Sequence, residues 1–218
     1  MLESQAQLAQ TISDTNTSAS AQMAQLQQAY STIQQYANHT DLANDAQARL
    51  RTAVDTVNDL CGTQIQVTDA ANGKLADENG AIQDVTASLG SYIDQKMQQI
   101  QGDAQQQNLS ALYQQQAEDI TALTQAQQAY NEKQKERDAY IQNYINTCGP
   151  YVTNAQEMAE SAWEASLANS EEAKAVNDAQ AALDACNTSI NNVSSSMTAQ
   201  AAIAEGNALS MQNLVLSS

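Results

Sequence analysis

Three cysteines, Cys61, Cys148 and Cys186, are the side chains of this sequence best suited to covalent chemistry. Because their number is odd, they cannot all pair within one molecule. Cys61 and Cys148 each precede a glycine at an expected helix end, and two helices that end at the same pole of a bundle would bring them together as a disulfide. Cys186 would then be a free thiol for a bond between chains. In the alternative, all three are small buried hydrophobic groups.

The remaining residues form no recognisable catalytic or metal-binding pattern. A catalytic nucleophile needs a base beside it, and the single histidine, His39, lies in a polar stretch between two expected helices. Phosphate-binding glycine loops, Gly-x-Ser-x-Gly, zinc-ligand pairs and calcium-loop spacing are all missing from the sequence. We therefore expect no enzymatic activity and no cofactor. The one metal interaction that we expect is weak, diffuse association of Ca²⁺ with acidic faces.

Five Asn-X-Ser/Thr triplets are candidate glycosylation sites, and their acceptors are Asn16, Asn38, Asn108, Asn187 and Asn192. About three such triplets would arise by chance in a chain so rich in Asn, Ser and Thr. Together with the cysteines and the low lysine content, they favour an extracellular or secretory-granule location. Residues 1–4 lack the basic and apolar regions of a signal peptide, and this is compatible with a mature, processed chain from a secreted precursor.

The charge balance limits the partners. The chain has 25 acidic and 8 basic residues, a formal net charge of −17, whereas nucleic acids and anionic lipids are bound by basic surfaces. One basic cluster, formed by Lys133, Lys135 and Arg137, is interleaved with Glu132 and Glu136, which is typical of a solvated helix face. No stretch has the ~18 apolar residues of a membrane span. We expect a soluble chain that neither binds nucleic acid nor inserts into a membrane.

The composition favours a few long helices. One proline and seven glycines are far fewer than the ~5% and ~7% of ordinary proteins, so the chain can make few turns. Alanine and glutamine favour helix. With no phenylalanine and one tryptophan, the chain lacks the bulky residues that fill a wide core. We expect Ala-rich helices that pack closely along a thin seam.

Apolar or small residues recur every three or four positions, as in coiled-coil heptads. The second predicted helix covers 43–60 and stops at Cys61-Gly62, where glycine is a favoured end residue. Residues 63–73 are the least helical and form either a short extended segment or a loop, with a turn at Asn72-Gly73. The stripe of the first predicted helix consists of Leu8, Ile12, Thr15, Ala19, Met23, Leu26, Tyr30, Ile33 and Ala37.

The third predicted helix has its apolar face over 82–100 and contains Gly80 and Gly90, which either weaken it or admit a neighbouring helix. Gly102-Asp103 is a break or a soft spot. The fourth helix ends at Cys148-Gly149-Pro150. Its predicted face consists of Leu109, Tyr113, Ile120, Leu123, Tyr130, Ile141, Tyr144 and Ile145. From 151 to 216 the pattern predicts one helix, interrupted at Asn187-Thr188-Ser189.

Trp163 and most of the eight tyrosines are expected in the helix seams. Tyr36, Tyr140 and Tyr151 lie off the main stripe or near helix ends, and we predict that they contact a partner. Runs of glutamine, such as those at 105–107 and 114–116, give uncharged polar faces. Such faces pack against copies of themselves with little repulsion, although drift in composition would produce the same runs.

The sequence predicts an all-α protein: an elongated, antiparallel, coiled-coil-like bundle of four to five long helices. We expect a single domain over 1–218, with halves at 1–102 and 103–218, a hinge at 62–73 and a helical hairpin turn at 148–151. The favoured function is that of a structural, self-assembling protein, such as a subunit of a fibre, granule matrix or extracellular coat. The alternative is a surface or secreted binding protein (a receptor, adhesin or effector) that engages another protein.

Overall fold

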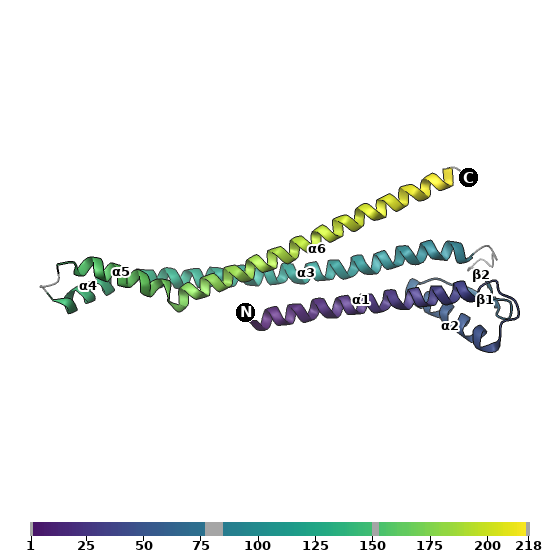
Figure 1. Ribbon diagram of the computed structural model, residues 1–218, viewed down its shortest axis with the longest axis horizontal. Coiled ribbons are helices and arrows are strands. Elements are labelled where there is room, and N and C mark those ends of the chain that lie inside the picture. The colour runs from purple at the N-terminus through teal and green to yellow at the C-terminus, as the bar shows by residue number, and fades with distance from the viewer. Residues whose placement is uncertain (1, 77–84, 150–152, 217–218) are drawn as a thin grey trace. The chain divides into compact units, whose positions relative to one another are not determined.

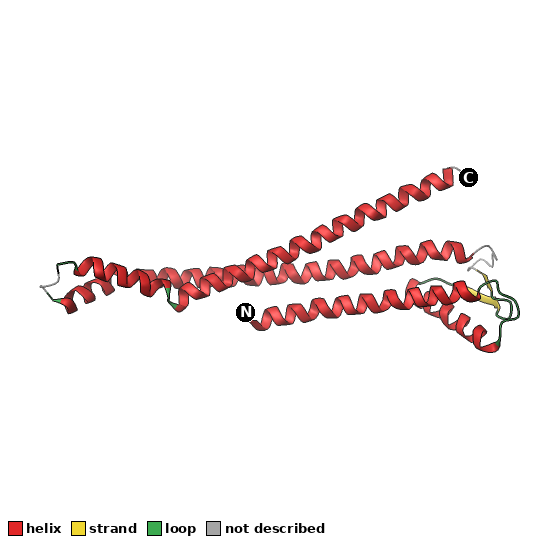
Figure 2. Ribbon diagram, in the orientation of Figure 1, coloured by secondary structure: helices red, strands yellow, loops and turns green. Residues whose placement is uncertain are grey.

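The computed structural model describes residues 2–76, 85–149 and 153–216, and helices make up most of them (Figure 1). Figure 2 shows the remaining parts, a small two-stranded sheet and the turns that connect the elements. The all-α fold class is therefore confirmed, whereas the elongated coiled-coil arrangement stays a prediction. The elements are α1 (Leu2–Tyr36), α2 (Asn44–Cys61), β1 (Gln66–Asp69), β2 (Lys74–Ala76), α3 (Val85–Lys135), α4 (Arg137–Cys148), α5 (Ala155–Ala168) and α6 (Glu171–Leu216).

The chain divides into two compact units. The N-terminal unit is Ala9–Asn108, and the C-terminal unit is Leu109–Ser218 together with Met1–Leu8. The helix α3 passes from one unit to the other, and its boundary between Asn108 and Leu109 lies close to the division that we expected at 102/103. The two units differ from the expected halves in the position of this boundary and in the grouping of Met1–Leu8 with the C-terminal unit.

The core of the N-terminal unit lies where α1, α2 and α3 pack against one another. Its most buried members come from all three predicted stripes and are Leu26, Ile33, Leu50, Val57 and Ile93. Each of these side chains stabilises the fold by about 1.5–3 kcal/mol when it leaves water. Heptad spacing thus identified the core positions of this unit correctly.

A β-hairpin follows α2 and is tied to it by one side chain. The Nδ2 of Asn58 donates to the carbonyl of Ile65 at 2.8 Å, and its Oδ1 accepts from the backbone N–H of Ile65 at 2.9 Å and from the hydroxyl of Thr63 at 2.8 Å. Gly62 ends α2 with a φ of 72° and donates its N–H to the carbonyl of Asn58. The strands confirm the extended alternative for this stretch.

The turn of the hairpin is fastened to the end of α1. The N–H of Asn38 donates to the carbonyl of Gly73 at 2.9 Å, and the N–H of Leu42 donates to the carbonyl of Ala71 at 2.8 Å. Gly73 has a φ of 59°, and a Cβ at this position would collide with the carbonyl oxygen of Tyr36. The segment is thus held by bonds to α2 and to the chain around the end of α1, and the hinge at 62–73 stays a prediction.

The helix α3 runs without interruption through two glycines. Gly90 lies directly against the phenol ring of Tyr30, so a side chain at position 90 would displace the ring. Gly90 therefore allows α1 and α3 to approach closely, as in our alternative that this glycine admits a neighbouring helix. Gly102 lies within the helix, so the break that we considered at Gly102-Asp103 does not occur.

A break at Glu136 separates α3 from α4 and was not predicted. Here the N–H of Glu136 donates to the carbonyl of Lys133 at 3.1 Å, a tighter turn than that of an α-helix. Lys133 pairs with Glu136 at 2.7 Å, and Lys135 pairs with Glu132. These exposed pairs confirm the solvated helix face that we predicted for the basic cluster.

The C-terminal unit contains a helical hairpin and then a long helix. α4 ends at Cys148 with Gly149 at a φ of 74°, and α5 packs back along α4 (Figure 1). The predicted helix end at Cys148-Gly149 agrees with the structure, and the rest of the predicted turn at 148–151 lies outside the described residues. The 151–216 segment is divided at Asn169–Ser170, where the hydroxyl of Ser170 accepts the N–H of Ala173 and caps α6.

The predicted interruption of this segment at Asn187-Thr188-Ser189 is wrong. The hydroxyl of Thr188 donates to the carbonyl of Asp184 at 2.9 Å, and that of Ser189 donates to the carbonyl of Ala185 at 3.1 Å. Both side chains therefore bond within their own helix, which is the other option open to Ser and Thr. α6 continues through them without a break.

Candidate interaction surfaces

The buried stripe of α3 is unusually polar. It consists of Ala104, Asn108, Leu112, Gln115 and Asp119, all of which are at most 8% exposed. Asp119 is the most buried of them at 1%. Charged residues are almost never fully buried without a partner. Because three of the five residues are polar, apolar periodicity did not predict this stripe.

Most polar groups of this stripe have partners. In the N-terminal unit, the Nδ2 of Asn108 donates to the Oδ1 of Asn16 at 2.8 Å. In the C-terminal unit, the Nε2 of Gln115 donates to the Oδ1 of Asp119 at 2.9 Å, and the thiol of Cys186 donates to the carbonyl of Leu112 at 3.2 Å. The Oδ2 of Asp119 has no hydrogen-bond partner in the part of the chain that the structure describes.

A second stripe of α3 is apolar and open to solvent. We call Leu109, Tyr113, Gln116, Ile120 and Leu123 the open stripe; their steps of 4, 3, 4 and 3 residues are those of a heptad. Tyr113 is 51% exposed and Ile120 is 48% exposed, and the other three are half-buried. Our prediction that Tyr113 and Ile120 lie in a buried seam is therefore wrong. The apolar residues do recur at heptad spacing, but the stripe that the chain buries is the adjacent one, which contains Leu112, Gln115 and Asp119.

The surroundings of the open stripe carry almost no charge. From Ala104 to Asn131 the sequence contains two charged residues, Glu118 and Asp119. Asp119 is buried, and Glu118 lies about 180° around the helix from Leu109, because successive residues turn by roughly 100°. The chain has a net charge of −17, but this surface is nearly uncharged.

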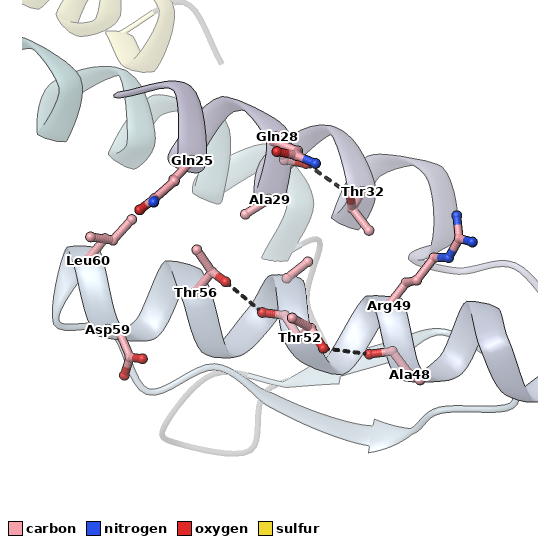
Figure 3. Close-up of a pocket in the computed structure, with 11 residues that line it drawn as sticks. Gln25, Gln28, Ala29, Thr32, Ala48, Arg49, Thr52, Thr56, Asp59 and Leu60 are labelled. Atoms are coloured by element: carbon pink, nitrogen blue, oxygen red, sulfur yellow. Dashed lines mark hydrogen bonds between the residues drawn. The ribbon is translucent and has the colours of Figure 1, made fainter. Parts of the chain in front are cut away.

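A second candidate surface is a groove between α1 and α2 in the N-terminal unit, with a volume of about 800 Å³. Figure 3 shows Ala29 and Thr56 between the two helices and Arg49 at one end of the groove. The hydroxyls of Thr52 and Thr56 bond to carbonyls of their own helix at 3.1 and 2.8 Å. The groove thus presents apolar groups of Ala29 and Leu60, the amides of Gln25 and Gln28, and the charged side chains of Arg49 and Asp59.

The predicted contact tyrosines have other roles. Tyr36 is half-buried and packs against the core of the N-terminal unit. Tyr140 stacks on Trp163 with ring centroids 5.2 Å apart and lies 6.3 Å from Tyr144. Both residues are half-buried and pack within the chain, and their contact with a partner stays a prediction. Tyr151 lies outside the described residues.

Trp163 confirms its predicted place in a helix seam. It is 4% exposed, and its contact with Tyr140 joins α5 to α4. Arg137 and Glu160 add an ion pair at 3.4 Å between the same two helices. Among the tyrosines that the structure describes, Tyr113 and Tyr92 are the exposed ones. The hydroxyl of Tyr92 donates to the carbonyl of Cys61 at 3.0 Å.

All three cysteines are free thiols. Cys61 and Cys148 end α2 and α4 as expected, but they belong to different units, and their disulfide stays a prediction. Burial raises the pKa of the Cys61 thiol, and burial together with the charge of Asp119 raises the pKa of the Cys186 thiol. Cys186 is 6% exposed, which contradicts the prediction of a thiol accessible to another chain.

The glycosylation candidates separate by exposure. Asn16, Asn38 and Asn192 are exposed and stay predictions. Asn187 is half-buried and its Oδ1 accepts from the Nε2 of Gln116 at 2.6 Å. Asn108 is 5% exposed inside α3, so a glycan there is incompatible with this packing.

Within 2–76, 85–149 and 153–216, no cluster of three or more His, Cys, Asp or Glu side chains is placed to hold a metal ion. None of the helices described there has the length and apolar character needed to cross a membrane. His39, the single histidine, is exposed in the turn after α1.

No protein-family profile, no curated protein and no solved structure matches this chain.

Proposed function

We propose that the chain is a structural, self-assembling helical protein, a subunit of a fibre, granule matrix or extracellular coat. The observation that carries this proposal is the open stripe, in which Tyr113 and Ile120 are about half exposed at heptad spacing. Exposed apolar residues in a contiguous row are typical of a protein interface. A heptad row in particular fits a second helix.

The distribution of charge supports the same proposal. In α6 the segment from Ala185 to Ala204 contains no charged side chain, and Ile203 within it is 59% exposed. Together with α3, the chain thus has two long uncharged helical surfaces, while its net charge of −17 is carried elsewhere. Charged surfaces keep proteins apart, so association would use the uncharged ones. The exposed acceptors Asn16, Asn38 and Asn192 fit the extracellular setting of the proposal.

The alternative, a helical protein that binds a different protein, is favoured by the groove between α1 and α2. Its volume of about 800 Å³ and its mixed lining of apolar groups, amides and the charged Arg49 and Asp59 suit the side chains of a partner helix. This alternative predicts a monomer at every concentration and a bound partner that is lost when Thr56→Trp fills the groove.

Sedimentation velocity over a hundredfold range of protein concentration, with electron microscopy of the same samples, tests the proposal. Self-assembly predicts that the sedimentation coefficient rises with concentration and that ordered filaments or sheets form at the upper end. A single monomeric boundary throughout would contradict it. Turnover of a small molecule by the purified chain would contradict both candidate functions.

A further inference from the structure

We propose that the open stripe of α3 is the self-association site and that it packs against the open stripe of a second copy of this chain. This inference rests on the proposed function, because it names the partner and the surface through which assembly would occur. It places Tyr113 and Ile120, which the chain leaves about half exposed, in the centre of an interface between two helices.

The spacing indicates a helix as the occupant. The steps of 4, 3, 4 and 3 in the open stripe continue to Gln127 and Tyr130 with steps of 4 and 3. The row therefore extends over 22 positions, or about 30 Å along the helix axis at 1.5 Å per residue. Side chains at this spacing insert as knobs between the residues of a facing helix that has the same repeat. A second α3 supplies that repeat.

The charge distribution indicates a second copy rather than a protein of opposite charge. A basic partner would be drawn to the acidic faces of this chain, because unlike charges attract at the range of the Debye length, about 8 Å. It would gain nothing from a row whose neighbourhood, from Ala104 to Asn131, exposes one charged residue, Glu118, on the opposite side of the helix. Two copies, each with a net charge of −17, can approach closely only along such a surface.

The residue types fit an interface of this kind. Tyrosine combines a large apolar ring with a polar hydroxyl, and it is enriched at protein interfaces. Gln116 interrupts the apolar row, and its side-chain amide is held by Asn187 of α6 at 2.6 Å. A fixed polar residue among apolar positions is a device that sets the register of two helices. A contact between two helices of this length buries less surface than a standard interface of about 1,600 Å². We therefore expect each contact to be weak and the assembly to be held by many such contacts.

The test compares Ile120→Lys with the matched control Gln125→Lys. Gln125 is exposed on the same helix and lies roughly 140° around it from Ile120. Each substitution changes the net charge from −17 to −16, so neither increases the overall repulsion between copies. We expect Ile120→Lys to raise the dissociation constant for self-association by at least about tenfold, because both copies lose the apolar contact and must bury an ammonium group. Gln125→Lys should leave the constant within twofold.

Circular dichroism checks that both variants keep the helicity of the wild type, as expected for substitutions at exposed or half-exposed positions. A photo-cross-linking residue at position 113 gives a readout that does not depend on stability. Its cross-links between copies should map to 104–131 of the second chain. Equal association of Ile120→Lys and wild type, or cross-links confined to other helices, would overturn the assignment of the site and leave self-assembly standing. A wild-type chain that stays monomeric would overturn both.

Discussion

At the residue scale, the environment of each thiol decides what it can do. Cys61 and Cys186 are buried, and their pKa values are raised, whereas Cys148 is half-buried as the last residue of α4. The thiolate is the reactive form of cysteine. A raised pKa therefore leaves less thiolate at neutral pH, in addition to the steric protection.

We predict that Cys148 reacts with iodoacetamide at pH 7.5 at least about tenfold faster than Cys61 and Cys186, because accessibility limits the two buried thiols. Mass spectrometry of tryptic peptides over a time course measures the three rates. The two buried thiols should label faster as the pH rises toward their raised pKa values, and all three should label at similar rates in urea. Fast labelling of Cys186 in the native chain would contradict its burial.

At the scale of elements, single residues connect helices to the hairpin. Asn58 satisfies a backbone donor and a backbone acceptor of Ile65, and it also accepts from Thr63. Buried backbone groups are costly when they lack a partner, so this one side chain determines the course of the chain after α2. Gly73 connects the turn of the hairpin to the end of α1. Its lack of a side chain allows the close approach to the carbonyl oxygen of Tyr36.

Asn58→Ala should lower the free energy of unfolding of the N-terminal unit by about 2–3 kcal/mol, because it removes three hydrogen bonds and leaves partners unsatisfied. Asn58→Asp keeps the Oδ1 acceptor but turns a second carboxylate oxygen toward the carbonyl of Ile65, where two acceptors repel each other, so it should also destabilise the unit. Urea unfolding followed by circular dichroism measures both. If the two variants unfold alike and like the wild type, the network does not stabilise the hairpin.

At the scale of the whole molecule, acidity competes with apolar contact. The net charge of −17 opposes association, and dissolved salt weakens that repulsion by screening. Contacts between apolar side chains of the open stripe involve no net charges, so screening by salt does not weaken them. The balance between the two terms should therefore shift toward association as ionic strength rises.

We predict that raising NaCl from about 10 mM to about 500 mM increases the weight-average sedimentation coefficient, since the Debye length falls from about 30 Å to less than 5 Å. CaCl₂ and MgCl₂ should match NaCl at equal ionic strength if Ca²⁺ associates only diffusely with acidic faces. Dissociation on adding salt would show that charge pairs hold the copies together. An effect of Ca²⁺ well beyond that of Mg²⁺ would show a specific calcium site.

Several structural features followed from the sequence alone. Scarce glycine and proline with abundant alanine and glutamine predicted long helices, since local backbone preference is a property of the residue itself. Cys61-Gly62 and Cys148-Gly149 marked two helix ends correctly, because glycine alone adopts a positive φ without cost. The buried positions Leu26, Ile33, Leu50, Val57 and Ile93 followed from heptad spacing.

Tertiary structure decided which face of a helix is covered. Periodicity shows that α3 has an apolar row at Tyr113 and Ile120, but the exposure of this row depends on where α6 lies. The position of α6 is set by contacts distant in sequence such as Cys186 with Leu112, just as Asn16 with Asn108 joins α1 to α3 in the N-terminal unit. The burial of Asp119 arises in the same way. Helix propensity acts within a few residues of the chain, whereas the packing of one helix on another depends on residues about 70–90 positions apart. The sequence therefore predicted the helices, but it could not predict that the open stripe is exposed.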